Sequence, residues 1–301
     1  MFDQLLSRGG LSLERLRTLC MVADARGIAK AAGNDAAKQS LFSRQIRELE
    51  EFFGTELTTR RGKHIALTPA GERLARIVRE HFQALSDFDH ESRSEPVTLR
   101  IGASNSVLEW ILIPKLSYLR RALPNVLIEL TSERTAEIVR GLNELNIDLA
   151  IVRKDAAPLR TKALTLPGLH YSLFLPAALV PNEAKSDVRI MFATLAIATS
   201  RGGMFREVLE TAAAKAGIPL RIDLSCASFA QAARAVQSGG YAAVLPSIAA
   251  SVLPMPAYVQ IALPFLKSYK RDLALVWNPR LANVRPIVEK SRDVLMALLL
   301  Q

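Results

Sequence analysis

The chain has 301 residues, of which 50% are apolar, enough for two or three domains with substantial cores. No stretch approaches the roughly 20 uninterrupted apolar residues that a membrane helix needs, and the opening MFDQLLSRGG lacks the basic-then-apolar order of a secretory signal, so we expect a cytoplasmic protein with no membrane partner. The net charge of +10 suggests a polyanionic partner, but residues 1–93 hold 15 basic against 13 acidic side chains, whereas residues 94–301 hold 24 against 16. Local geometry, rather than bulk charge, must therefore locate any nucleic-acid site.

Three helices are predicted between residues 12 and 53. The first, Ser12–Gly27, has apolar residues at helical spacing, with Ser12 as its N-cap and Gly27 as its stop. The second is short and ends in the turn formers of Gly33–Asp35. The third, KQSLFSRQIRELE (Lys38–Glu50), has one apolar and one polar stripe. The apolar stripe is Phe42, Ile46, Leu49 and Phe53, and the polar stripe is Ser40, Ser43, Arg44 and Arg47.

The order of charges in the third helix is the reverse of the order that a helix dipole favours. Lys38, Arg44 and Arg47 come early, where the dipole favours acids, and three glutamates come late, where it favours bases. This order costs a few tenths of a kcal/mol per charge. An anionic ligand at the positive end of the helix would offset that cost.

A basic hairpin and a long helix are predicted next. ELTTRRGKHIALT (Glu56–Thr68) alternates around Gly62, which completes an all-α-type winged helix-turn-helix domain over residues 1–68. Thr68 can cap a helix over residues 69–93, and Pro69 suits its first position. Its narrow seam favours a dimerisation and linker helix over one packed on its own domain, and His81 in the seam is expected to pack rather than to act as a pH switch. The seam is Leu74, Val78, His81, Leu85 and Phe88.

From Val97 onward, apolar runs of strand length alternate with amphipathic helices. Strands buried on both faces are predicted, which implies parallel α/β sheets in a domain over residues 94–301. The predicted strands are VTLRIGAS, NVLIELTS, IDLAIVR, IMFATLAIATS, YAAVLP and DLALVWN, and the predicted helices are WILIPKLSYLRRALP, TAEIVRGLNEL, MFREVLETAAAKAG, FAQAARAVQSGG and VRPIVEKSRDVLMALLLQ.

The motif AKAA followed by KQSLFSRQIRELEEFFGTELTTRRGKHIALTPAGERL, within Ala29–Leu74, resembles the LysR-type transcriptional regulators. LRIGAS, ALPNVLIEL, LNIDLAIVR and VQSGGYAAVLPS resemble that family's effector-binding domain in the right order. Asp35 and Lys38 depart from the family pattern, which leaves the first residue of the third helix open. The resemblance implies a periplasmic-binding-protein-like domain, with subdomain I at about 97–162 and 268–301 and subdomain II at about 163–267. It also implies double-stranded DNA, a small-molecule co-inducer and further copies of the chain, as dimers and commonly tetramers, as partners, and it allows RNA polymerase as another.

The third helix is then a recognition helix, which enters the major groove with its N-terminal residues toward base edges and phosphates. Gln39 and Ser43 can hydrogen-bond bases, and Arg44 can reach guanine or phosphate. The expected DNA-binding residues are Gln39, Ser40, Ser43, Arg44 and Arg47 in the helix and Arg60, Arg61 and Lys63 in the wing. The alternative is that these side chains only solvate the surface.

Three strand-loop-helix junctions carry the expected effector site. Ligands of such folds lie beyond the C-terminal ends of parallel strands, where helix N-termini offer unpaired N–H groups. The expected residues are Ser104, Asn105, Ser106, Arg134, Thr135, Ser200, Arg201 and Gly202, with Arg153, Ser228 and Phe229 as further candidates. Their hydroxyls and guanidinium groups favour a small anionic ligand such as a carboxylate. Ordinary helix capping is the alternative for each residue.

No catalytic residue, metal site or bound cofactor is predicted. The four histidines, His64, His81, His90 and His170, are scattered, and no HExxH, Ser-His-Asp, GxGxxG or GxxxxGKS/T pattern stands in the sequence. Cys20 and Cys226 lie far apart in apolar patterns, which indicates buried thiols. An enzyme and a transport solute-binding protein remain the rival functions, because α/β folds serve both. Neither rival accounts for the helix-turn-helix.

Overall fold

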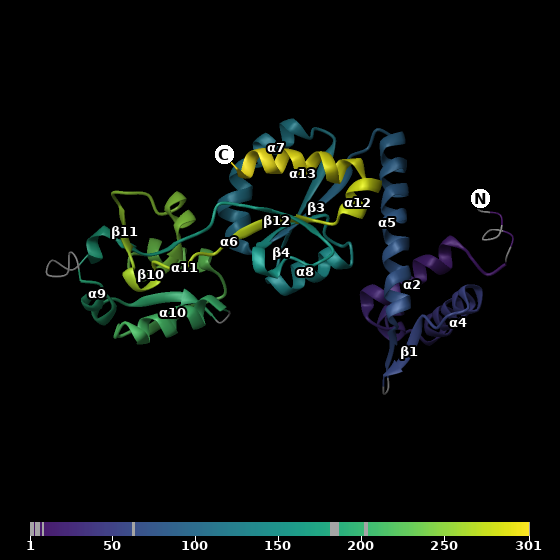
Figure 1. Cartoon of the computed structure of the whole chain (residues 1–301), viewed down its shortest axis with the longest axis horizontal. Helices are drawn as coiled ribbons and strands as arrows, with labels where there is room; N and C mark the ends of the chain where they lie inside the picture. The colour runs from purple at the N-terminus through teal and green to yellow at the C-terminus, as the bar shows by residue number, and fades with distance from the viewer. Residues whose placement is uncertain are drawn as a thin grey trace. The chain divides into compact units, whose positions relative to one another are not determined.

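The computed structural model describes residue 3, residue 7 and residues 9–61, 64–180, 187–201 and 204–300. Its contacts divide the chain into two units, Met1–Glu95 with Asn283–Arg285 and Pro96–Ala282 with Pro286–Gln301. Figure 1 shows helices and a small hairpin in the first unit and two sheets with flanking helices in the second. Within these described ranges, none of the helices combines the length and the apolarity needed to cross a bilayer.

The first unit is a winged helix-turn-helix followed by a long helix, as the sequence predicts. Ser12 caps α2 by accepting a hydrogen bond from the Arg15 amide at 3.2 Å, and Thr68 caps α5 by accepting one from the Gly71 amide at 3.1 Å. The stop of α2 lies one residue before the predicted Gly27, because Arg26 adopts the left-handed conformation with φ 55°. The elements are α2 (Leu13–Ala25), α3 (Ile28–Ala31), α4 (Ala36–Phe53), β1 (Thr58–Arg61), β2 (His64–Leu67) and α5 (Pro69–Ser92).

The core of the first unit lies among the apolar faces of α2, α4 and α5. Leu19, Ile46 and Leu49 are almost fully buried in one cluster. The α4 stripe ends on Phe52, which is 4% exposed, and the prediction of Phe53 is wrong because that ring is 37% exposed. Positions i+3 and i+4 from Leu49 share its face of the helix, so the spacing alone could not decide between the two rings.

The second unit contains two five-stranded sheets, and both are mixed rather than parallel as predicted. The sheet orders are β4-β3-β5-β12-β6 and β11-β7-β10-β8-β9. In the first sheet β12 runs antiparallel to both its neighbours, and in the second β7 does the same. We call the first sheet with its helices lobe I and the second with its helices lobe II. The strands are β3 (Val97–Ala103), β4 (Val126–Ser132), β5 (Leu149–Arg153), β6 (Lys162–Thr165), β7 (Tyr171–Pro176), β8 (Ile197–Ser200), β9 (Ile222–Cys226), β10 (Ala242–Pro246), β11 (Tyr258–Ala262) and β12 (Leu273–Trp277).

Two predicted strands need correction. IMFATLAIATS is not one strand: its first half lies in helix α9 (Val188–Thr194), which Asp187 caps by accepting a hydrogen bond from the Arg189 amide at 2.8 Å, and only its end forms β8. The strand β4 is not buried on both faces, because it lies at the edge of its sheet and its residues are half-buried or exposed. Strands β6, β7, β9 and β11 are absent from the prediction.

The helices of the second unit follow the predicted order with one long segment broken up. WILIPKLSYLRRALP forms a π-helical turn at Leu108–Leu112, a 3-10 turn at Ile113–Lys115 and then α7, because Pro114 has no N–H to continue a regular helix. The α-helices are α6 (Asn105–Val107), α7 (Leu116–Ala122), α8 (Thr135–Asn143), α9, α10 (Met204–Lys215), α11 (Phe229–Gln237), α12 (Pro279–Val284) and α13 (Pro286–Leu299).

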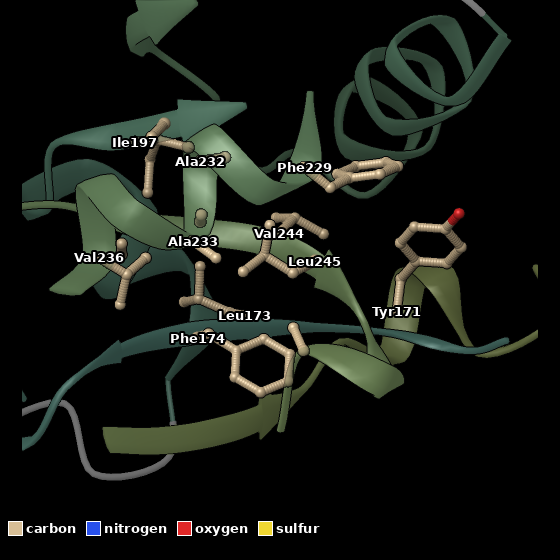
Figure 2. Close-up of a cluster of buried hydrophobic side chains, with 14 of the residues drawn as sticks. Tyr171, Leu173, Phe174, Ile197, Phe229, Ala232, Ala233, Val236, Val244 and Leu245 are labelled. Atoms are coloured by element: carbon tan, nitrogen blue, oxygen red, sulfur yellow. The ribbon is translucent and has the colours of Figure 1, made fainter. Parts of the chain in front are cut away.

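The core of lobe II is built from strands β7 and β10 and helix α11. Figure 2 shows Leu173 and Val244 from the strands gathered with Ala233 from α11, where small side chains let the helix lie close to the sheet. Tyr171 and Phe229 stand at one end of this cluster (Figure 2). This end of the core faces the segments that connect the two lobes, because the centroid of the Tyr171 ring lies 5.4 Å from that of Tyr269.

Two chain segments cross between the lobes, and they pair with each other. Lobe I extends past residue 162, the border expected from the sequence, because β6 pairs with β12 through Thr165. The chain then crosses to lobe II and returns before Leu273. Leu169 and Arg271 exchange backbone hydrogen bonds of 2.8 and 2.9 Å at the crossing, and we call this pair the hinge.

Candidate nucleic-acid interface and effector cleft

The start of the candidate recognition helix is defined by a capping carboxylate. Asp35 accepts a hydrogen bond from the Lys38 amide at 3.1 Å, so α4 begins at Ala36. This resolves the start that the sequence left open and places Gln39 and Ser40 in the first turns. Asp35 is therefore a helix cap at the position where it departs from the family pattern.

The expected DNA-binding side chains of α4 lie on its accessible side. Arg44 has a side chain that is 70% exposed, and Ser40 and Arg47 are also exposed. Gln39 and Ser43 are half-buried, so only part of each side chain can reach a ligand. Three of the five expected side chains are thus accessible to DNA, and the other two are accessible in part.

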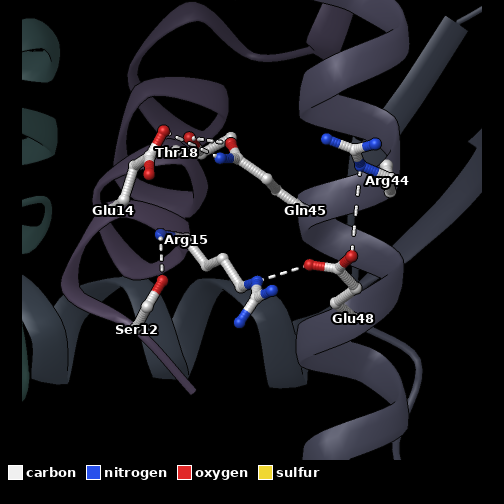
Figure 3. Close-up of polar contacts among 7 residues, drawn as sticks. All are labelled: Ser12, Glu14, Arg15, Thr18, Arg44, Gln45 and Glu48. Atoms are coloured by element: carbon white, nitrogen blue, oxygen red, sulfur yellow. Dashed lines mark hydrogen bonds and ion pairs between the residues drawn. The ribbon is translucent and has the colours of Figure 1, made fainter. Parts of the chain in front are cut away.

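A buried polar network that the sequence reasoning missed fixes α4 on α2. Figure 3 shows Gln45 of α4 reaching toward Thr18 and Glu14 of α2. The Thr18 hydroxyl donates to Gln45 Oε1 at 2.7 Å, and Gln45 Nε2 donates to Glu14 Oε1 at 3.1 Å. Gln45 lies three residues after Phe42 on the apolar side of the helix, and a polar residue at such a position is the signal that could have found it.

The late glutamates of α4 have structural partners. Glu48 accepts a hydrogen bond from Arg15 Nε and lies 4.0 Å from Arg44 Nε (Figure 3). Glu50 Oε1 accepts from the amides of Leu57 and Thr58 at 2.8 and 2.9 Å, which ties the start of the wing to the helix. Two of the acids in the reversed charge order are thus accounted for inside the unit.

The wing is a two-stranded hairpin with Arg60 exposed on β1. Its strands pair antiparallel from Thr58 with Leu67 to Arg61 with His64. Gly71 of α5 allows the close approach of the hairpin, because a Cβ there would lie 2.1 Å from the Leu57 carbonyl oxygen. Lys63 lies outside the described residues, and so does the side chain of Arg61.

The predicted seam of α5 divides into a packed part and an exposed part. Val78 is 5% exposed and packs within the unit, whereas Leu85 and Phe88 are 58% and 68% exposed. Ile77 adds a third exposed apolar side chain at 38%. One part of this helix therefore packs on its own unit, and the part beyond residue 84 leaves apolar side chains exposed, so that dimerisation through it stays a prediction. His81 is exposed in the single chain.

Part of the expected effector site assembles where the two lobes meet. Asn105 Nδ2 of lobe I donates to Ser228 Oγ of lobe II at 3.4 Å, which brings the first junction next to α11. Ser228 also caps α11 by accepting from the Gln231 amide at 3.2 Å, so the capping alternative holds for that residue. Arg153 Nη1 lies 2.7 Å from Met204 Sδ across the lobes. Ser104 and Ser106 flank Asn105, half-buried and buried respectively, and Phe229 follows Ser228 with its ring buried.

The other expected residues are not drawn into this contact. Arg134 and Arg201 have exposed side chains that make no hydrogen bond or ion pair with the described residues. Thr135 and Ser200 are half-buried at their junctions. Gly202 lies outside the described residues.

A cavity of about 280 Å³ lies at the crossing between the lobes. It contains one predicted residue, Arg153, and a charged run on the return segment that sequence reasoning missed. That run, YKRD, directly precedes a buried strand, a position that could have drawn attention to it. The lining residues are Arg153, Lys154, Asp155, Met204, Tyr269, Lys270, Arg271 and Asp272. A larger groove of about 580 Å³, between α10 and Phe265, contains none of the predicted residues.

A winged helix-turn-helix joined to a two-lobed α/β domain defines a class of regulatory proteins, and comparison with known proteins identifies the family. The model described as "Bacterial regulatory helix-turn-helix protein, lysR family" matches residues 13–72, and the model described as "LysR substrate binding domain" matches residues 92–296. The chain belongs to the LysR family of transcriptional regulators.

Relatives are similar at a modest level of identity. DgdR of Burkholderia cepacia is 29% identical over 47% of this chain and 49% of its own length, so the chain matches about half of that relative. PecT of Dickeya dadantii is 29% identical over 76% of this chain and 70% of its own length. Both are described as HTH-type transcriptional regulators.

Solved structures show the same fold over nearly the whole chain. Full-length OxyR of Pseudomonas aeruginosa superposes with a TM-score of 0.64 at 18% identity, covering 96% of this chain and 95% of that one. Full-length CbnR in complex with its target DNA superposes with a TM-score of 0.52 at 20% identity, covering 94% and 100%. At this identity the likeness is one of fold.

Proposed function

We propose that this protein is a sequence-specific DNA-binding regulator of transcription that responds to a small anionic effector. The observation that carries the proposal is the surface of α4, where Arg44 and Arg47 are exposed at the side expected to meet DNA while Glu48 and Glu50 are engaged within the unit. CbnR, a relative in fold, has been solved on its target DNA. In this proposal the protein is a regulator rather than an enzyme, works in the cytoplasm, and meets RNA polymerase on the DNA.

Titration of promoter duplexes with the full chain tests DNA binding. If a dimer contacts about 6 to 10 phosphates, affinity should fall by about 10³ or more between roughly 50 and 200 mM salt. The Arg44→Ala/Arg47→Ala variant should lose discrimination between promoter and unrelated duplex. Salt-independent binding, or unchanged discrimination by this variant, would refute the assignment of α4.

A second copy of the chain is the proposed partner of α5. Leu85 and Phe88 are large apolar side chains left exposed on one helix, and burying them against an equivalent helix would remove both from water. We propose dimers of this kind, which assemble further into tetramers. Sedimentation of the full chain and of a seam variant tests the dimer.

The proposed effector binds where the lobes meet, with no other cofactor. The cavity there holds four basic side chains, Arg153, Lys154, Lys270 and Arg271, against two acidic ones, Asp155 and Asp272. This excess of positive charge supports an anionic co-inducer. Calorimetric titration with small carboxylates and with neutral and cationic analogues tests the charge class, and binding of the neutral or cationic compounds alone would refute it.

A further inference from the structure

One arginine in the cavity is surrounded by aromatic rings. Arg271 Cζ lies 5.6 Å from the ring centroid of Tyr171, 5.8 Å from that of Phe205 and 5.9 Å from that of Phe229. The Tyr171 and Phe205 rings are stacked with centroids 4.1 Å apart. This wall of rings holds the guanidinium in place but accepts no conventional hydrogen bond from it.

Two polar atoms of this cluster have no hydrogen-bond partner among the described residues. They are Arg271 Nε, which can only donate, and the hydroxyl of Tyr171, whose side chain is 4% exposed. The two acids that line the cavity are paired with other bases of its lining, Asp272 with Lys270 at 3.3 Å and Asp155 with Arg153 at 3.5 Å. Because buried donors are almost always satisfied in native proteins, an acceptor from outside the chain is expected here.

The Tyr171 hydroxyl is a second unpaired donor beside Arg271. Burial raises the pKa of the phenol far above its ordinary value, so the group is a neutral donor, and Arg271, Tyr269 and Arg153 are the charged and polar groups that act on it. All three of these neighbours line the cavity. Because Arg271 Cζ lies 5.6 Å from the centroid of the Tyr171 ring, the unpaired hydroxyl belongs to a side chain packed directly against the arginine that lines the cavity.

We propose that Arg271 and Tyr171 together anchor the carboxylate of a small, flat, single-ring monoanion, the body of which packs on Tyr269 and Met204. The inference rests on the proposed anionic effector and names its anchor and its class. A volume of about 280 Å³ accommodates one ring and excludes nucleotides and other large anions. Met204, 48% exposed, is an adaptable apolar side chain at the mouth.

The anchor lies on the hinge. Arg271 is the residue whose backbone pairs with Leu169 at the crossing, and the cavity also takes Arg153 from lobe I and Met204 from lobe II. A ligand that bonds to Arg271 therefore contacts both lobes and the segment about which they would move. Binding at this point shifts the equilibrium between lobe arrangements by its difference in affinity for them.

Calorimetric titration of the full chain with benzoate, benzamide and benzylammonium tests the proposal. Benzoate alone should bind. Arg271→Gln should weaken benzoate by about 10- to 100-fold, the loss expected for hydrogen bonds to a charged group. The matched control Lys267→Gln removes one positive charge from an exposed residue of the same segment that does not line the cavity, and it should change affinity by less than about threefold. Equal losses in the two variants would overturn the role of Arg271.

Tyr171→Phe separates ligand contact from structure. The substitution deletes an unpaired buried hydroxyl, so the ligand-free variant should be at least as thermostable as the wild type while binding benzoate several-fold more weakly. A ligand-free variant that melts lower, or unchanged benzoate affinity, would overturn the role of Tyr171. Binding of inorganic phosphate without benzoate would overturn this inference but leave the anionic effector standing, whereas binding of benzamide or benzylammonium alone would overturn both.

Discussion

The Thr18–Gln45 hydrogen bond offers a quantitative test of how the candidate recognition helix is held. Thr18 is 3% and Gln45 6% exposed, and their side chains are joined at 2.7 Å. Thr18→Val keeps the shape and leaves Gln45 Oε1 buried without this donor, which should cost about 1–3 kcal/mol. Adding Gln45→Leu removes the stranded acceptor, so the double variant should recover most of the loss. The double variant also removes the hydrogen bond from Gln45 to Glu14, but this loss costs little because the Glu14 carboxylate is exposed and water can replace the donor.

The two tryptophans provide an internal control for this test. Both, Trp110 and Trp277, lie in the second unit, so tryptophan fluorescence reports that unit while far-UV circular dichroism reports the whole chain. In a unit of this size about 1 kcal/mol shifts the melting temperature by roughly 4–8 °C. Thr18→Val should lower the dichroism transition and leave the fluorescence transition in place. Losses that simply add in the double variant would refute the reasoning, because they would mean that the two side chains do not act as a pair.

Three further outcomes are expected. Arg44→Ala should reduce discrimination between DNA sites, whereas Arg60→Ala in the wing should weaken binding to all sequences and lower the salt slope by about 1 per phosphate contact, as read from titrations at several salt concentrations. Leu85→Asp should sediment as a monomer while Ser86→Asp, an exposed neighbour off the seam, should not; an unchanged dimer in the first would move the interface elsewhere. Burial raises the pKa of the Cys20 thiol from 9.0 to about 11, so its contribution to stability is present below pH 9 and lost as the pH rises through 11. Melting curves of Cys20→Ala should lack that alkaline loss, and an identical loss in the variant would exclude Cys20 as its source.

The sequence predicted correctly those helix ends that depend only on nearby residues. Ser12 and Thr68 act as the caps expected of them, because a cap depends on three or four consecutive residues. The prediction of Phe53 in the apolar stripe is wrong, because positions i+3 and i+4 from Leu49 both lie near its face of the helix and only packing buries Phe52. The predicted strand IMFATLAIATS is wrong in its first half because Asp187, which precedes it, caps a helix there.

The mixed sheets and the cavity depend on contacts that the local pattern does not contain. A run of buried apolar residues such as Leu273–Trp277 indicates a strand but not its direction, which is set by where the chain re-enters the sheet. The role of Arg271 likewise depends on a distant contact. Its neighbours in sequence are charged and solvent-facing, and only the pairing with Leu169, about a hundred residues away, brings it to the aromatic cluster.

Two of the late glutamates of α4 have structural roles, whereas its early basic residues are exposed to a ligand, and this difference can be tested. Glu50 anchors the first residues of the wing through the Leu57 and Thr58 amides, whereas the exposed Glu51 makes no such contact with the described residues. Glu50→Ala should therefore speed hydrogen exchange at those two amides, and Glu51→Ala, which removes the same charge, should not. Removing the exposed charge should instead raise DNA affinity slightly at low salt, because one less acid faces the phosphates. Equal exchange rates in the two variants would mean that Glu50 does not hold the wing, and the late acids of this helix would again need an explanation.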